Sequence, residues 1–168
     1  MPKNRTSKQA VRASGTPMKS LLAVLLLTSA AAFAADRPNL AGDWKVNFDK
    51  SDYGVIPAPS SFTRKITHAE PSITFEDLQE TAIGPDRTER KYTTDGKEIK
   101  FDAQGAEVKS AVTWSADGKL VVKTKVEVIS LDITETITPG ADGKTLESSV
   151  HIVSPQGAVD VKILFVKQ

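Results

Sequence analysis

The chain of 168 residues contains no cysteine. This absence excludes disulfide bonds, thiolate metal sites and cysteine nucleophiles together. It also excludes the lipid-modified cysteine that a bacterial lipoprotein carries at its cleavage point. The folded part of the chain therefore has to rely on its hydrophobic core.

Sequence motifs for catalysis are missing as well. There is no Gly-x-Ser-x-Gly elbow for a nucleophilic serine. The two histidines, His68 and His151, lack a ligand spacing such as His-x-His, and we expect His68 to be exposed beside the Glu70-Pro71 turn. Aspartate and glutamate are so numerous that no carboxylate pair for glycoside hydrolysis stands out. The sequence predicts no enzyme, no cofactor and no metal site.

No apolar run is long enough to span a membrane, which takes about 20 residues. Leu21–Leu27 is the longest run, and small residues follow it up to the Ala32-Phe33-Ala34 triplet. A basic residue, a short apolar run and an A-x-A triplet make up a secretory signal peptide. We therefore expect residues 1–34 to be cleaved after Ala34, and the product to be secreted.

The polar and basic n-region of this signal peptide, residues 1–17, is unusually long. Met18 offers an alternative start, because Met18–Ala34 by itself has the layout of an ordinary signal peptide. Arg5 and Arg12 are not adjacent, so there is no twin-arginine signal. The expected compartment is the periplasm or the extracellular space.

The near-neutral charge of the whole chain conceals an acidic mature protein. The first 34 residues carry five basic side chains and no acidic one, which leaves 17 basic against 21 acidic side chains, a net charge of −4. Such a surface argues against nucleic acid or anionic membrane as a partner. The remaining 134 residues suit one domain, with 35–41 as a lead-in and 42–168 as the folded part.

Alternation of apolar and polar residues runs through the mature chain. In Gly42–Asp49 the side chains of Trp44, Val46 and Phe48 share one face, which is typical of a half-buried strand. Asp52–Ser61 contains two prolines, which exclude a regular helix there. Up to ten strands are predicted: Gly42–Asp49, Ser61–Thr67, Ser72–Leu78, Arg87–Thr93, Glu98–Phe101, Glu107–Trp114, Lys119–Val128, Leu131–Thr138, Thr145–Val153 and Val159–Val166.

Three copies of Asp-Gly-Lys, at Asp95–Lys97, Asp117–Lys119 and Asp142–Lys144, separate these strands. Asp-Gly is the strongest short hairpin signal and suits a type I′ turn. Successive hairpins without long crossovers favour an all-β, up-and-down antiparallel barrel of eight to ten strands over a Greek-key sandwich. Closure of a barrel also removes exposed strand edges.

Two stretches carry a family resemblance. Asn39–Trp44 contains the Gly-x-Trp that opens the first strand of lipocalins and fatty-acid-binding proteins. The middle of fatty-acid-binding proteins is similar in the order of turns and the spacing of strands to the stretches Thr93–Lys97, Glu107–Trp114 and Asp117–Val121. The chain thus resembles a bacterial secreted lipocalin-like (calycin) protein. The resemblance implies a barrel in which the tryptophan plugs one end.

The chain also departs from that family. A proline-containing loop, Asp52–Ser61, stands where intracellular fatty-acid-binding proteins have a helix-turn-helix lid. Their terminal Arg-x-Tyr pair, which grips a carboxylate, is replaced by Ile163–Lys167. The resemblance therefore supports the fold more than a fatty-acid ligand.

Polar side chains that share a face with apolar ones are the candidate ligand-binding residues. Arg64 shares its face with Phe62 and Ile66, and Glu135 shares its face with Ile133 and Ile137. A buried charge is costly unless it is paired or solvated, so an internal ion pair or a polar pocket is indicated. The alternatives are a shift of the alternation at a bulge, or a position in water at the barrel mouth. The predicted ligand-binding residues are Arg64, Arg90, Tyr92, Trp114 and Glu135.

These observations predict a secreted or periplasmic binding protein that carries a small hydrophobic or amphipathic molecule non-covalently as a monomer. The alternative is the same barrel with a filled core, acting as a cell-envelope interaction module through its loops, notably Asp52–Ser61. Acid–base catalysis at the barrel mouth is a third and weaker hypothesis.

Overall fold

A computed structural model describes residues 37–103 and 105–168. The predicted signal peptide and its cleavage site lie outside the described residues. Within the described part of the chain, no helix has the length and apolar character needed to cross a membrane.

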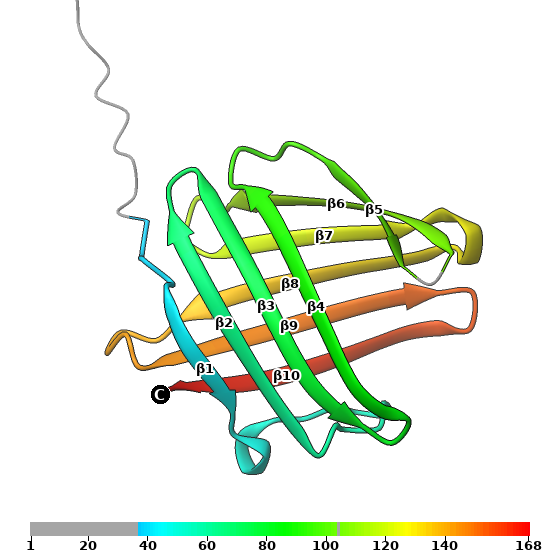
Figure 1. Cartoon of the computed structure of the whole chain (residues 1–168), viewed down its shortest axis with the longest axis horizontal. Coiled ribbons are helices and arrows are strands. Elements are labelled where there is room, and N and C mark those ends of the chain that lie inside the picture. Colours follow the sequence, from blue (N-terminus) through cyan, green and yellow to red (C-terminus); the bar gives the residue numbers. More distant parts are fainter. Residues whose placement is uncertain (1–36, 104) are drawn as a thin grey trace, which may run out of the picture. The chain divides into compact units, whose positions relative to one another are not determined.

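Ten β-strands and two short 3₁₀ helices make up the domain (Figure 1). Their order is β1 (Gly42–Val46), η1 (Phe48–Lys50), β2 (Ser61–Ala69), β3 (Ser72–Thr81), β4 (Gly84–Thr93), β5 (Ile99–Ala103), β6 (Ala106–Trp114), β7 (Leu120–Val126), η2 (Glu127–Ile129), β8 (Leu131–Pro139), β9 (Thr145–Ser154) and β10 (Gly157–Lys167). The predicted all-β class and strand number are confirmed.

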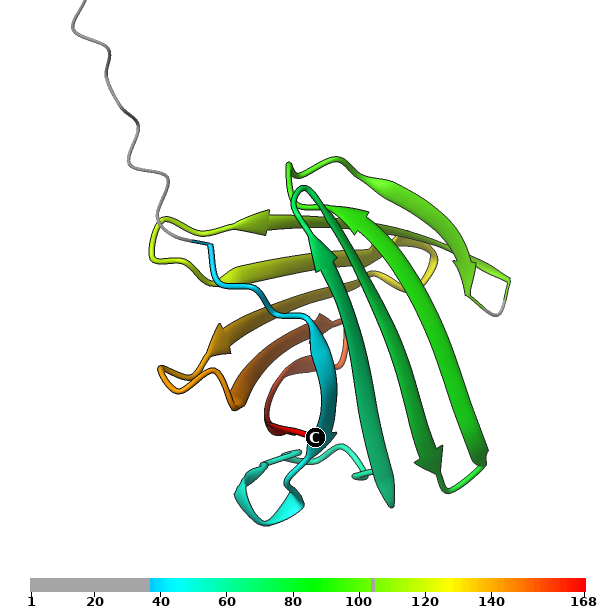
Figure 2. The same ribbon diagram turned by 60° about the vertical axis from the view of Figure 1, so that its left-hand side comes forward.

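The strands form one antiparallel sheet in the order β4-β3-β2-β1-β10-β9-β8-β7-β6-β5. β1 joins the two halves by pairing with both β2 and β10. The sheet curls so that β2–β4 cross over the other strands, and β4 and β5 diverge at its two edges (Figures 1 and 2). The predicted up-and-down barrel is confirmed as a nearly closed one.

The hairpin predicted at Asp95-Gly96 is wrong, because β4 and β5 are the unpaired edges of the sheet. The chain crosses instead to β6, where Asp95 forms an isolated bridge with Thr113 and the Gly96 amide donates to the Val112 carbonyl. These bonds close the barrel near this turn and leave β4 and β5 free to separate further along.

The type I′ geometry predicted for the Asp-Gly turns is also wrong. Gly118 and Gly143 have positive φ, but the aspartates before them do not. The Gly118 amide donates to the Ser115 carbonyl, as in a type I turn that ends in a left-handed glycine. This longer loop needs only one residue with positive φ, which spares the aspartate the steric cost of that conformation.

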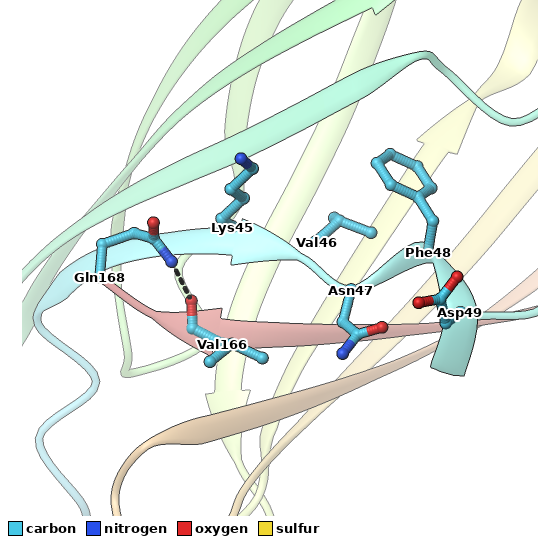
Figure 3. A pocket seen from close by; sticks show the side chains of 7 residues that line it. All are labelled: Lys45, Val46, Asn47, Phe48, Asp49, Val166 and Gln168. Atoms are coloured by element: carbon cyan, nitrogen blue, oxygen red, sulfur yellow. Dashed lines mark hydrogen bonds between the residues drawn. The ribbon is translucent and has the colours of Figure 1, made fainter.

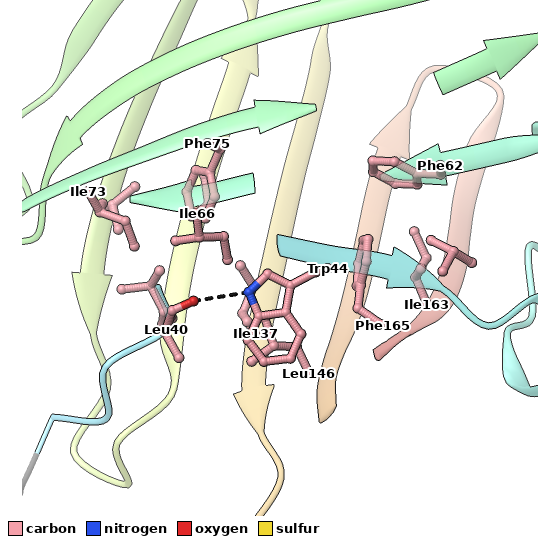
Figure 4. Close-up of a cluster of buried hydrophobic side chains, with 14 of the residues drawn as sticks. Leu40, Trp44, Phe62, Ile66, Ile73, Phe75, Ile137, Leu146, Ile163 and Phe165 are labelled. Carbon is pink, nitrogen blue, oxygen red and sulfur yellow. Dashed lines mark hydrogen bonds between the residues drawn. The ribbon is translucent and has the colours of Figure 1, made fainter. Parts of the chain in front are cut away.

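The inward faces of the strands form the core (Figure 4). Trp44 is 2% exposed and its indole N–H donates to the Leu40 carbonyl, so it plugs the barrel as the resemblance implies. Phe62 packs edge to face against Phe165, with ring centroids 5.1 Å apart. Aromatic side chains therefore fill much of this core.

The two ends of the barrel differ in how they are closed. We call "base" the end that holds residues 37–41 and the turns at 70–71, 94–98, 115–119 and 140–144. We call "mouth" the end with the loop 47–60, Gly105 and the connections 82–83, 127–130 and 155–156. Inward side chains near the base, such as Ile137 and Leu146, are buried. Inward side chains near the mouth, such as Ile133 and Ile152, are only half-buried.

Candidate functional site

Arg64 lies at the centre of a buried ion network between the base and the mouth. Its Nε and Nη2 donate to the two carboxylate oxygens of Asp77 at 2.7 and 2.9 Å. Asp77 stands directly opposite on β3, while Glu135 reaches Arg64 Nη1 from β8 at 2.5 Å. The network therefore connects strands from both halves of the sheet.

The ionised state of this network is maintained by its own charges. Burial opposes the charge on Asp77 and Glu135, but the neighbouring guanidiniums outweigh it and lower the pKa of both carboxyls. Burial likewise opposes the charge on Arg64, and the two carboxylates raise its pKa above the usual value. The Arg64 guanidinium carbon also lies 5.2 Å from the ring centroids of Phe75 and Phe165. A buried cation between aromatic faces and two carboxylates is well compensated.

Arg90 joins the network from β4 and keeps one buried N–H group without a partner in the part of the chain that the structure describes. Its Nη2 donates to Asp77 Oδ2 at 2.5 Å, and 24% of its side chain is exposed. The Arg90 Nε–H is buried without a hydrogen-bond partner among the described residues. The structure thus brings together three of the five predicted residues, Arg64, Arg90 and Glu135.

Tyr53, in the loop between η1 and β2, is a site residue that sequence reasoning missed. Its hydroxyl is the second buried side-chain atom without a partner in the described part of the chain. Burial raises the pKa of this phenol, and the charge of Arg64 opposes that rise. The Tyr53 ring stacks on Phe48, and both rings pack against the core. An irregular loop has no strand alternation, so no sequence signal pointed to Tyr53.

Asp77 and Ser148 were also missed, although a signal for both existed. Asp77 shares strand parity with the buried Ile73 and Phe75, just as Arg64 does with its neighbours on β2. Ser148 lies on β9 and donates to Glu135 Oε1 at 2.6 Å. The alternation rule applied to every strand would have identified both.

Tyr92 and Trp114 lie apart from the ion network. Tyr92 packs edge to face on Phe75 and its hydroxyl accepts a bond from Ser110. Trp114 lies at the base, where its indole N–H donates to Glu70 Oε1. Their predicted role in ligand binding stays a prediction that these contacts do not favour.

The exposed position predicted for His68 is wrong, because the base buries it. The Leu40 amide donates to His68 Nδ1 at 3.2 Å, so the proton of the neutral ring is on Nε2, which faces Glu70 Oε1 at 3.1 Å. The N-terminal lead-in covers this histidine, and strand alternation could not reveal that cover.

Glu70 seals the base by binding four separate segments. Its carboxylate accepts bonds from His68, Thr94, Trp114 and Arg37. Burial opposes its ionisation, but these donors together lower its pKa. This one carboxylate thereby ties together the lead-in, β2, the connection after β4 and the end of β6.

A pocket of 410 Å³ lies outside the barrel, beside β1 and η1 (Figure 3). Its lining has no buried charge, and the Gln168 amide already donates to the Val166 carbonyl within it. The residues that line it are Lys45, Val46, Asn47, Phe48, Asp49, Val166 and Gln168. None of the buried polar atoms that lack a partner within the described ranges lies in this lining.

Comparison with known proteins defines the class of this fold. No protein-family model matches the chain, and no curated protein sequence matches it. Among solved structures, several calycin barrels match the chain in fold. A secretory abundant heat soluble protein from Ramazzottius varieornatus is 15% identical, with a TM-score of 0.58 over 76% of this chain and 94% of that one.

Two further structures come from proteins named for their ligands. The zebrafish ileal bile acid-binding protein, complexed with cholic acid, is 17% identical, with a TM-score of 0.53 over 76% of this chain and 98% of that one. Lipid binding protein 8 from Caenorhabditis elegans, without ligand, is 16% identical, with a TM-score of 0.54 over 76% and 94%. At such identities the likeness shows the fold alone: a barrel of the fatty-acid-binding-protein type.

Proposed function

We propose that this protein carries a small hydrophobic or amphipathic molecule, bound non-covalently inside the mouth half of the barrel. The observation that carries the proposal is the exposure of inward aliphatic side chains. Ile133, Ile152 and Val159 face inward in register with one another, yet each keeps contact with solvent. Apolar side chains that line an accessible interior are the usual wall of a ligand site.

The ion network supplies the polar end of such a site. Arg90 and Tyr53 each hold a buried donor that has no partner among the described residues. A few polar groups on an apolar wall fix the orientation of a ligand. This combination favours an amphipathic molecule over a pure hydrocarbon.

The names of the structural neighbours support the same function by analogy of fold. One was solved with cholic acid and another is named a lipid-binding protein. Fold alone does not imply function, so the analogy adds to the interior geometry and does not replace it. We propose binding without catalysis.

The signal-peptide pattern in residues 1–34 supports a secreted or periplasmic location. A carrier in that location would operate without disulfide bonds, which is consistent with the absence of cysteine. We propose that the carrier works outside the cytoplasm as a monomer.

The test fills the mouth half with a larger side chain. Ile133→Trp places an indole among the inward aliphatic side chains of β8 and β9, whereas Thr134→Trp places it on the outer face of the same strand. We expect the inward variant to lose binding of the neutral probe N-phenyl-1-naphthylamine at least about tenfold. The outward variant should bind the probe as the original protein does. Circular dichroism and a melting curve check that both variants fold.

Native mass spectrometry of protein purified from its host provides an independent measurement. A co-purifying apolar molecule supports the carrier. Equal probe binding in both tryptophan variants would place any binding outside the barrel and overturn the proposal.

One observation favours the alternative of an interaction module with a filled core. Large aliphatic side chains project from the loops, with Val55 83%, Ile83 98% and Val128 74% exposed. All three belong to connections at the mouth end. A protein that binds neither probe nor host lipid, yet loses a protein partner when these residues become serine, would be such a module.

A further inference from the structure

The ion network is balanced in charge before any ligand binds. It contains two guanidiniums, Arg64 and Arg90, and two carboxylates, Asp77 and Glu135. Each carboxylate is bonded to at least one guanidinium within 2.9 Å. A ligand that carries its own carboxylate would place a third negative charge against two cations.

Two buried side-chain atoms lack a hydrogen-bond partner among the described residues, and both can donate. Arg90 offers a buried Nε–H, and Tyr53 offers a buried hydroxyl. Arg90 belongs to the network, because its Nη2 donates to Asp77, and Tyr53 stacks on Phe48 where both rings pack against the core. A hydroxyl, carbonyl or ester oxygen would accept from these donors without adding charge.

We infer that the barrel selects uncharged apolar molecules with a hydrogen-bond acceptor, such as long-chain alcohols, ketones or esters, over free fatty acids. Two physical reasons support this selection. A desolvated charge without a counter-charge is costly, and the two cations here are already neutralised. A neutral acceptor satisfies the unpaired donors, which removes the penalty of leaving them buried and unbonded.

The experiment compares two ligands of equal chain length, 1-decanol and decanoate, by displacement of N-phenyl-1-naphthylamine at neutral pH. This inference rests on the proposed function, because both ligands must enter the barrel. We expect decanol to displace the probe at a concentration at least about tenfold lower than decanoate. Equal or tighter binding of decanoate would overturn the inference and leave the carrier function standing. Failure of the probe itself to bind would remove the carrier function.

A variant that removes one negative charge from the network sharpens this test. Glu135→Gln keeps the side-chain shape and an oxygen that can accept the Ser148 hydroxyl, but it leaves one guanidinium charge uncompensated. We expect the preference for decanol to fall by about tenfold or to reverse. Glu76→Gln, on the outer face of β3, is the matched control and should keep the original preference. An unchanged preference in Glu135→Gln would contradict the inference.

Two further measurements do not depend on the folding of that variant. Lowering the pH below the pKa of decanoic acid makes the ligand neutral, so its affinity for the original protein should approach that of decanol. Tyr53→Phe removes a buried hydroxyl without a partner, so it should melt at or above the original temperature while binding decanol several-fold more weakly. A constant decanoic acid affinity across pH, or unchanged decanol affinity in Tyr53→Phe, would count against the inference.

Discussion

The base and the mouth of this barrel are built from the same strands but are stabilised differently. At the base, Trp44 and Leu40 are almost fully buried and Glu70 binds four segments. At the mouth, inward side chains such as Ile152 remain half-buried and no residue plays the part of Glu70 among those described. Because more inward surface is buried at the base, we expect the base to contribute more to stability than the mouth. The ion network around Arg64 lies at their boundary.

The boundary gives one of the two largest expected effects. Arg64→Ala removes the guanidinium that binds both Asp77 and Glu135, and it leaves Asp77 with Arg90 and Glu135 with the Ser148 hydroxyl. We expect the free energy of unfolding to fall by about 3–5 kcal/mol, as for other broken buried ion pairs. Chemical denaturation measures this change. Arg87→Ala, at a side chain that is 75% exposed, is the control, and a comparable loss there would contradict the special role of the network.

A matched pair of truncations compares the two halves directly. Trp44→Ala at the base should cost about 3–5 kcal/mol, because it removes a buried aromatic plug and leaves a cavity. Ile152→Ala at the mouth should cost about 1 kcal/mol, because its side chain already contacts water. Urea titrations of both variants give the two values. Equal costs would show that the two halves are packed alike and would remove the distinction between them.

The seal at the base should show a dependence on pH. The pKa of Glu70 is lowered by its donors, so its contribution to stability is present above the unfolded value of about 4.3 and is lost as the pH falls through the folded value. We expect Glu70→Gln to cost about 1–2 kcal/mol at pH 7, since the partly exposed carboxylate is screened by water. The difference between the two proteins should shrink below about pH 4. A difference that grows on acidification would contradict this role.

The smallest effect is expected at the tip of the mouth. Ile83 is 98% exposed in the turn between β3 and β4. Ile83→Ser should change the free energy of unfolding by less than about 0.5 kcal/mol, because no buried contact is lost. Thermal melting measures the shift. A larger loss would mean that the mouth loops take part in the packing of the domain.

Strand positions could be predicted well because alternation is a local property. Each strand has one face toward the core, so the placement of Arg64 and Glu135 with apolar neighbours was readable residue by residue. The same alternation places Asp77 on the inward face of β3. The conformation of the turns was less readable, because Asp-Gly suits more than one loop length.

The strands, their inward faces and the core position of Trp44 could be predicted from the amino-acid pattern, since each depends on residues that are near one another in the chain. The separation of β4 from β5, the burial of His68 under the lead-in and the burial of the Tyr53 hydroxyl without a partner among the described residues arise from the folded arrangement. Those features depend on segments that are distant in sequence and meet only when the sheet curls. The physical reason is that closure of a barrel is a property of all its strands together, while alternation belongs to each strand alone.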